Sequence, residues 1–75
     1  MNDLGYRLKK VRKARRMTRK EIGDLIGINY ADTRLDAYET GKTLILSSFL
    51  IKICQISKIS VDWLLGRTDN PKIPN

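Results

Sequence analysis

The charged side chains best suited to bind a polyanion are gathered in the first twenty residues. Nine Lys and Arg residues occur there without an acid between them: Arg7, Lys9, Lys10, Arg12, Lys13, Arg15, Arg16, Arg19 and Lys20. Residues 1–20 thus carry nine bases and one acid (Asp3), a net charge of +8, whereas residues 21–75 carry six bases and seven acids, a net charge of −1. This asymmetry favours a surface for nucleic acid or an anionic membrane, and the alternative is a solvated helix face.

Other chemistries lack the side chains that they need. The sequence has one Cys, Cys54, and no His, so it offers no Cys/His zinc site, no disulfide within the chain and no histidine acid–base catalyst. It also lacks a phosphate-binding loop and a convergent pair of carboxylates. We therefore expect a protein that is not an enzyme and has no metal, no cofactor and no small-molecule ligand, with Cys54 in the core.

The compartment expected from the sequence is the cytoplasm. A lone thiol without disulfides fits a reducing environment. No stretch approaches the roughly 20 apolar residues that span a bilayer, and no apolar signal-peptide segment follows the basic start. The length of 75 residues and the 41% hydrophobic content predict one small domain. We place it at residues 1–68, followed by a tail at 69–75 that holds both Pro residues and is expected to fray.

The elements that position the basic residues are predicted to be helices. Leu4, Leu8, Val11 and Ala14 recur at helical spacing, which predicts a helix over residues 3–15 with its bases outward. Arg12 falls at the edge of the apolar stripe, where its side chain can reach a buried partner.

A second, short helix follows directly. Thr18 and Glu21 form the pattern of a capping box just before the apolar positions of this helix, Ile22, Leu25 and Ile26. Gly27 can adopt the left-handed conformation that ends a helix, and Ile28 can fold back as a hydrophobic contact. Gly23, four positions before the turn, is small enough to allow close approach of a neighbouring helix.

Three more helices complete the expected fold. Leu35 and Tyr38 are the apolar pair of the third, which ends near Gly41 and has either Asn29 or Asp32 as its N-cap. The fourth has Ser47 or Ser48 as its N-cap, and its inward residues are expected to be Leu50, Ile53 and Ile56. Ser60 caps a short fifth helix with the apolar residues Val61, Leu64 and Leu65, followed by Gly66. We expect Tyr38 and Trp63 in the core, together with the loop residues Leu44, Ile45 and Leu46.

A short helix, a glycine turn and a second short helix, preceded by a basic helix, make up the pattern of a helix-turn-helix. The segments "RLKKVRKARRMTRKEIGDLIGI", "YETGK" and "SVDWLLGRTDNP" resemble the lambda-repressor-like (Cro/repressor, XRE-type) helix-turn-helix family. The resemblance covers nearly the whole chain. It implies a compact all-α, five-helix domain that binds DNA as a dimer and places its third helix in the major groove.

Two features depart from the family pattern. Arg19 stands directly after the cap of the second helix, where relatives commonly have Gln. A phosphate contact would survive that change, but a base contact specific to Gln would not. The segment from Gly27 to Glu39 is also about two residues longer than the family usually has, which shifts the register of the residues that face the bases.

The resemblance implies which residues contact DNA. Alignment on "YETG" puts Leu35 in the core and leaves four side chains near the groove: Thr33, Arg34, Asp36 and Ala37. Tyr30 joins the base contacts, which are therefore expected to be Tyr30, Thr33, Arg34 and Ala37. Arg34 is the best single candidate because its guanidinium can bind guanine O6 and N7 together. The alternatives for Arg34 are a phosphate contact or a surface pair with Asp36 or Glu39.

The expected phosphate contacts lie on both sides of the third helix. Thr18, Arg19 and Lys20 stand at the start of the second helix, with Arg16 nearby. Lys42 and Thr43 follow the third helix. Arg12 and Glu39 match family positions that form an ion pair. Asp32 and Asp36 count against DNA binding because phosphates repel carboxylates, unless they cap the helix or accept from cytosine N4.

The function that we expect is sequence-specific binding of double-stranded DNA by a small transcriptional repressor. It would bind a pseudo-palindromic operator as a homodimer, with a dimer patch around Val61 to Leu65 implied by the resemblance. The alternative is a protein-interaction module of the same fold, such as a regulator-binding or antitoxin-type adaptor. A cationic helix on a membrane surface is a third possibility, but the other helices need the apolar face of the first for their core.

Overall fold

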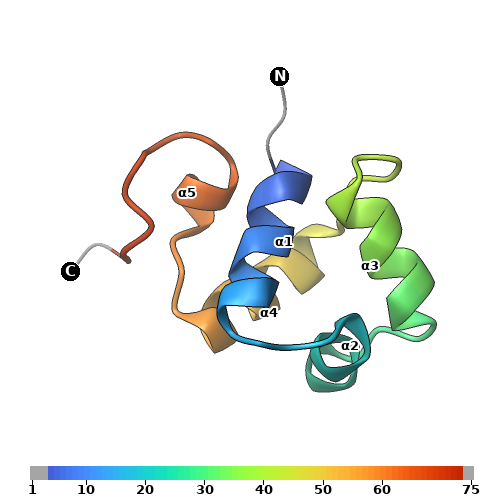
Figure 1. The fold of residues 1–75 in the computed structure, drawn as a ribbon. Helices are drawn as coiled ribbons and strands as arrows, with labels where there is room; N and C mark the ends of the chain where they lie inside the picture. The colour runs from blue at the N-terminus through green and yellow to red at the C-terminus, as the bar shows by residue number, and fades with distance from the viewer. Residues whose placement is uncertain (1–3, 74–75) are drawn as a thin grey trace.

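The computed structural model describes residues 4–73, among which it has five helices and no strand (Figure 1). The helices are α1 (Leu4–Ala14), α2 (Arg19–Ile26), α3 (Ala31–Glu39), α4 (Ser47–Ser57) and α5 (Val61–Leu64). The all-α, five-helix architecture expected from the sequence is therefore confirmed. The expected start of the first helix at residue 3 lies outside the described residues.

α1 runs through the middle of the molecule, with α3 on one side and α5 on the other (Figure 1). Leu4, Leu8 and Val11 are buried, as their spacing predicts, but Ala14, the fourth position of the predicted stripe, is exposed at the end of the helix. Every other helix also contributes to the core, whose further members are Ile22, Ile26, Ile28, Ala31, Leu35, Tyr38, Leu50, Ile53, Cys54 and Leu64. Burial raises the pKa of the Cys54 thiol, as expected for a core cysteine.

α2 begins and ends where the sequence predicts. The Glu21 amide donates to the Thr18 hydroxyl at 3.1 Å, and the Thr18 amide donates to the Glu21 carboxylate at 2.8 Å, which completes a capping box. Gly27 follows α2 in the left-handed conformation, with φ at 81°. Ile28 then donates its amide to the Gly23 carbonyl at 2.9 Å and is buried against the core.

α2 and α3 pack on each other more extensively than any other pair of helices. A Cβ built on Gly23 would lie 2.1 Å from the Cβ of Ala31. Non-bonded carbon atoms keep a separation of about 3.5 Å or more, so only glycine at position 23 permits this approach. The small residue expected at the helix crossing is confirmed, and Ala31 lies opposite it.

The expected N-caps of α3 and α4 are wrong. The N-cap of α3 is Tyr30, in the left-handed conformation with φ at 55°, and no side chain caps the helix. Neither Asn29 nor Asp32 has that role, because close packing of Ala31 on Gly23 sets the start of α3.

α4 begins one or two residues earlier than expected, depending on which of the two expected caps is taken. Its N-cap is Leu46, whose carbonyl accepts the Leu50 amide at 3.0 Å. The expected caps Ser47 and Ser48 instead occupy the first turn of the helix, and both are exposed.

Several apolar side chains expected in the core are exposed. The buried stripe of α4 consists of Leu50, Ile53, Cys54 and Ser57, so Ile56 falls outside it. In the loop before α4, Leu44 is 70% exposed and Leu46 is also exposed, whereas only Ile45 is partly buried against the core. Alternate residues of this extended segment point in opposite directions, so one side chain of the three packs inward.

The C-terminal part of the chain lies against α1. Ser60 accepts the Trp63 amide at 3.3 Å and caps α5 as predicted, and Leu64 is fully buried. The Ser60 amide donates to the Pro71 carbonyl at 2.9 Å, which holds the following segment on the domain. Residues 69–73 are exposed, the fraying of this tail stays a prediction, and residues 74–75 lie outside the described part of the chain.

Candidate nucleic-acid interface

One long side of α3 faces solvent, and the other packs on α2 and α1. Thr33 is exposed in the first turn and Ala37 is half-buried one turn later. Tyr30, at the N-cap, is 86% exposed. These three predicted base contacts are spaced three and four residues apart, so they lie along one side of α3. Leu35, expected in the core, is buried on the opposite side.

Arg34 lies half-buried beside α4. Its Nη2 atom donates to the Tyr38 hydroxyl at 3.3 Å, and its Cζ atom lies 5.6 Å from the centre of the Phe49 ring. The side chain therefore makes neither of the surface pairs, with Asp36 or Glu39, that the sequence left open. To bind a guanine it would have to leave the Phe49 ring, at a cost of about 0.5 to 1 kcal/mol for a cation–π contact of this kind.

The expected partners Arg12 and Glu39 lie together at the junction of α1 and α3. Arg12 Nε is 2.7 Å from Glu39 Oε2, and Arg12 Nη2 donates to Glu39 Oε1 at 3.2 Å. Arg12 Nη1 also donates to the Met17 carbonyl at 3.0 Å. The side chains are 12% and 2% exposed, so this two-pronged ion pair lies in the protein interior.

The start of α2 carries two backbone amides with no acceptor among the described residues, those of Arg19 and Lys20. Such amides and the positive end of the helix dipole form a site for an anion. Lys20 is exposed and pairs with Asp24 at 3.2 Å, while Arg16 is exposed with φ at 56°. Beyond the other end of α3, Lys42 and Thr43 are exposed and their amides donate to the Ala37 carbonyl.

The capping box makes α2 sensitive to acid. A hydrogen bond from the Thr18 amide to the carboxylate lowers the pKa of Glu21 below its usual value, so this contribution to stability is present at neutral pH and is lost as pH falls through that lowered pKa. We expect the urea midpoint of the native chain to fall more between pH 7 and pH 3 than that of a Glu21→Gln variant, in which the capping group does not titrate. Equal losses in the two proteins would contradict this role.

A helix-turn-helix domain family model matches residues 5–70, which is most of the chain. This match spans α1 to α5 and includes the Gly23–Ala31 crossing and the Gly27 turn. The chain belongs to the helix-turn-helix family. The lambda-repressor-like, XRE-type resemblance found in the sequence is confirmed.

One relative extends the comparison to a named protein. It is called an uncharacterized HTH-type transcriptional regulator YobD of Bacillus subtilis (strain 168), and it is 32% identical over 65 residues. The alignment covers 87% of this chain but 56% of the relative, so the helix-turn-helix domain described here spans little more than half of that protein. No solved structure matches the chain at a comparable level of significance.

Arg19 of the helix-turn-helix domain is turned toward α3. Its three guanidinium nitrogens approach three carboxylates, those of Asp32 at 3.4 Å, Asp36 at 3.3 Å and Glu39 at 3.3 Å. Partial burial lowers the pKa of Arg19, but the charges and hydrogen bonds of these acids outweigh that effect and raise the pKa above its usual value. The sequence did not predict this cluster. Because the segment after Gly27 is longer than the family pattern, the register of Asp32 and Asp36 relative to Arg19 was not known.

Two bases, Arg7 of α1 and Arg15 just after it, are directed away from α3. Arg7 donates to the carbonyls of Trp63 and Thr68, and its Cζ atom lies 4.9 Å from the centre of the Trp63 ring. Arg15 donates to the Ser57 carbonyl. The bases of the first twenty residues are therefore directed to two sides of the helix-turn-helix domain. Arg7 and Arg15 contact its C-terminal half, and Arg19 contacts α3.

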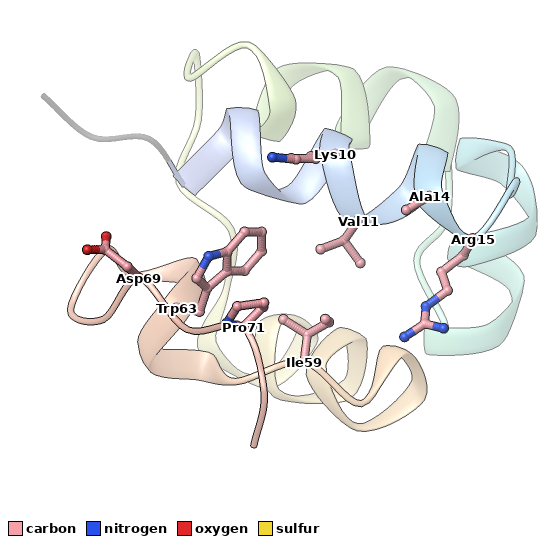
Figure 2. Close-up of a pocket in the computed structure, with 8 residues that line it drawn as sticks. All are labelled: Lys10, Val11, Ala14, Arg15, Ile59, Trp63, Asp69 and Pro71. Carbon is pink, nitrogen blue, oxygen red and sulfur yellow. The ribbon is translucent and has the colours of Figure 1, made fainter. Parts of the chain in front are cut away.

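An apolar hollow of about 370 Å³ lies between α1 and the C-terminal segment, away from α3 (Figure 2). Val11 and Ala14 of α1 form one wall, and Ile59, Trp63 and Pro71 form the other. No group of three or more Cys, Asp or Glu residues in the described part of the chain could hold a metal ion. None of the helices described is long and apolar enough to cross a membrane.

Proposed function

We propose that this domain binds double-stranded DNA in a sequence-specific manner and that it regulates transcription, acting as a repressor that occupies a promoter. The observation that carries the proposal is the packing of α3, whose Ala31 lies against α2 at Gly23 while Asp32 and Thr33 on its outer side are exposed. A helix held rigidly in this way can enter the major groove as a unit. The name of the Bacillus subtilis relative, a transcriptional regulator, supports the same function.

Three of the proposed base contacts can reach DNA without a change in side-chain position, because they already lie on the accessible side of α3. They are Tyr30, Thr33 and Ala37. Arg34 joins them if it leaves the Phe49 ring. On the proposed DNA complex, phosphates are held by the free amides and side chains near Thr18 and Lys20 on one flank, with Arg16 beside them. Lys42 and Thr43 hold the other flank.

We further propose that the domain acts in the cytoplasm as a homodimer on a pseudo-palindromic operator. Leu65 is 46% exposed and Val61 is half-buried, which supports a contact around α5. In such a dimer the two α3 helices would face successive major grooves, about 34 Å apart or a multiple of that distance.

A protein-interaction module is the second candidate, and the exposed carboxylates of Asp32 and Asp36 on α3 favour it. A protein partner would present bases to these acids. Its binding to the domain would depend less steeply on salt than DNA binding, since no condensed counterions are released from a duplex.

Selection of bound duplexes from a random pool of about 30 base pairs, at about 150 mM salt, tests the proposal. We expect enrichment of an inverted repeat with half-sites about one helical turn apart. Thr33→Ala should relax the preference at one base pair of each half-site, with a loss of about 1 to 3 kcal/mol in discrimination. Binding without enrichment would show that the domain contacts only phosphates, and no binding at all would favour the protein-interaction module.

A further inference from the structure

The side of α3 that would meet DNA carries two carboxylates one helical turn apart. Asp32 is 84% exposed and Asp36 is 47% exposed at the side chain. Bare carboxylates in this position would repel the phosphates on both sides of the groove, because like charges brought together at an interface cost several kcal/mol. A domain that places α3 in the major groove therefore needs a cation beside these carboxylates to offset the repulsion.

Arg19 is such a cation, because its guanidinium lies beside both aspartates. Each of its nitrogens faces a different acid: Nη1 faces Asp32, Nη2 faces Asp36 and Nε faces Glu39. The Arg19 side chain is 25% exposed and spans from the first residue of α2 to the outer side of α3. Glu39 is also paired with Arg12 and meets only Nε of Arg19, so Nη1 and Nη2 are left for the two aspartates.

The contacts leave one oxygen of each aspartate available. Arg19 approaches Oδ1 of Asp32 and Oδ1 of Asp36, whereas the structure shows no partner for either Oδ2 atom among the described residues. A carboxylate oxygen is only an acceptor, and in the major groove the base that a carboxylate suits is cytosine, which presents its N4 amino group as a donor. Fixed by Arg19, each aspartate therefore offers an oriented acceptor with reduced charge.

We infer that Arg19 is an internal counterion that makes Asp32 and Asp36 into base contacts for cytosine, instead of being a phosphate contact itself. This inference rests on the proposed DNA binding and names the residue that makes it compatible with the acids on α3. A neutral side chain would leave the two aspartates without a cation.

A double-mutant cycle on DNA affinity tests the inference. The proteins are the native chain, Arg19→Gln, the pair Asp32→Asn and Asp36→Asn, and the triple variant, each titrated against the selected duplex by fluorescence anisotropy. Arg19→Gln should weaken binding at least about tenfold when the aspartates are present and about twofold or less when they are asparagines. Lys20→Gln is the matched control, because an exposed cation at the same helix end should cost the same affinity in both backgrounds.

The salt dependence and the selected sequences give independent readouts. Loss of a phosphate contact lowers the salt slope by about 1, so we expect that change for Lys20→Gln and not for Arg19→Gln. Repeating the selection with the asparagine pair should shift the preferred base from cytosine toward adenine, because asparagine binds adenine N6 and N7.

Three results would separate the possible failures. An equal loss for Arg19→Gln in both backgrounds, with a lower salt slope, would make Arg19 a phosphate contact and overturn the inference while DNA binding stands. Absence of any DNA binding by the native chain would overturn the proposed function first. If Arg19→Gln unfolds at the temperature of the binding assay, Arg19→Lys replaces it, since lysine keeps the charge but cannot reach three acids. A loss of DNA affinity that persists in the asparagine background would again refute the counterion role.

Discussion

Arg12→Ala should lower the free energy of unfolding by about 3 kcal/mol, and the melting temperature by about 12 °C or more, because it leaves a buried carboxylate without its main partner. Glu39 is 2% exposed at the side chain and receives two of its contacts from Arg12. Arg19 remains beside Glu39 at 3.3 Å, so the loss should fall at the lower end of the range for a broken buried pair. Thermal and urea unfolding at pH 7 measure it.

The matched control is Lys13→Ala, which removes an exposed base one residue further along α1. Its side chain makes no hydrogen bond or ion pair among the described residues, so stability should stay within about 0.5 kcal/mol of the native value. Replacing both Arg12 and Glu39 with Met should recover much of the loss, because two apolar side chains leave no stranded charge. An unchanged melting temperature for Arg12→Ala would contradict the pairing.

Gly23→Ala should cost about 2 kcal/mol of stability and should weaken DNA binding by more than that loss explains. The added Cβ would meet Ala31 at 2.1 Å, so α2 and α3 must separate or tilt. The better helix propensity of alanine recovers only about 0.5 to 1 kcal/mol. Because the start of α3 moves with Ala31, the base contacts should shift even in molecules that remain folded.

Moving the methyl group across the contact tests this explanation directly. The double variant Gly23→Ala with Ala31→Gly keeps one methyl group between the helices, and its stability should return to within about 1 kcal/mol of the native value. A double variant as unstable as Gly23→Ala alone would place the strain somewhere other than this crossing. Circular dichroism melting and anisotropy on the same samples separate folding from binding.

The parts of the fold that could be predicted from the sequence are those fixed by local chemistry. The capping box at Thr18, the left-handed Gly27 and the Ser60 cap each depend on residues within a few positions of one another. The stripe of Leu4, Leu8 and Val11 likewise follows from helical periodicity alone. Where a side chain has one local partner or one regular spacing, the pattern determines the structure.

The parts that could not be predicted depend on contacts between distant segments. Gly5 is an example, because a Cβ there would lie 2.5 Å from the Tyr38 carbonyl oxygen, a clash that only the packing of α1 on α3 creates. The N-cap of α3 followed the position of Ala31 instead of the polar side chains nearby. Leu44 was expected in the core because it is apolar, but the loop had room for only one inward side chain.

The candidate site divides in the same way. The Arg12–Glu39 pair was expected from the resemblance, and the structure places the two side chains together. The contacts of Arg19 with Asp32 and Asp36 were not expected, since they depend on the register of α3 after a longer turn. The base and phosphate contacts stay predictions, and DNA selection is the experiment that decides them.

The fully buried Leu64 belongs to α5, the last helix of the domain, and Arg7 of α1 reaches the same helix across 56 residues of sequence. The first helix therefore finds its final partners only when nearly all of the domain is present. On a ribosome, the growing chain cannot close its core until α5 has left the exit tunnel, because the apolar side of α1 stays partly uncovered until then. We therefore expect the domain to fold only after α5 has been synthesised, in one cooperative step.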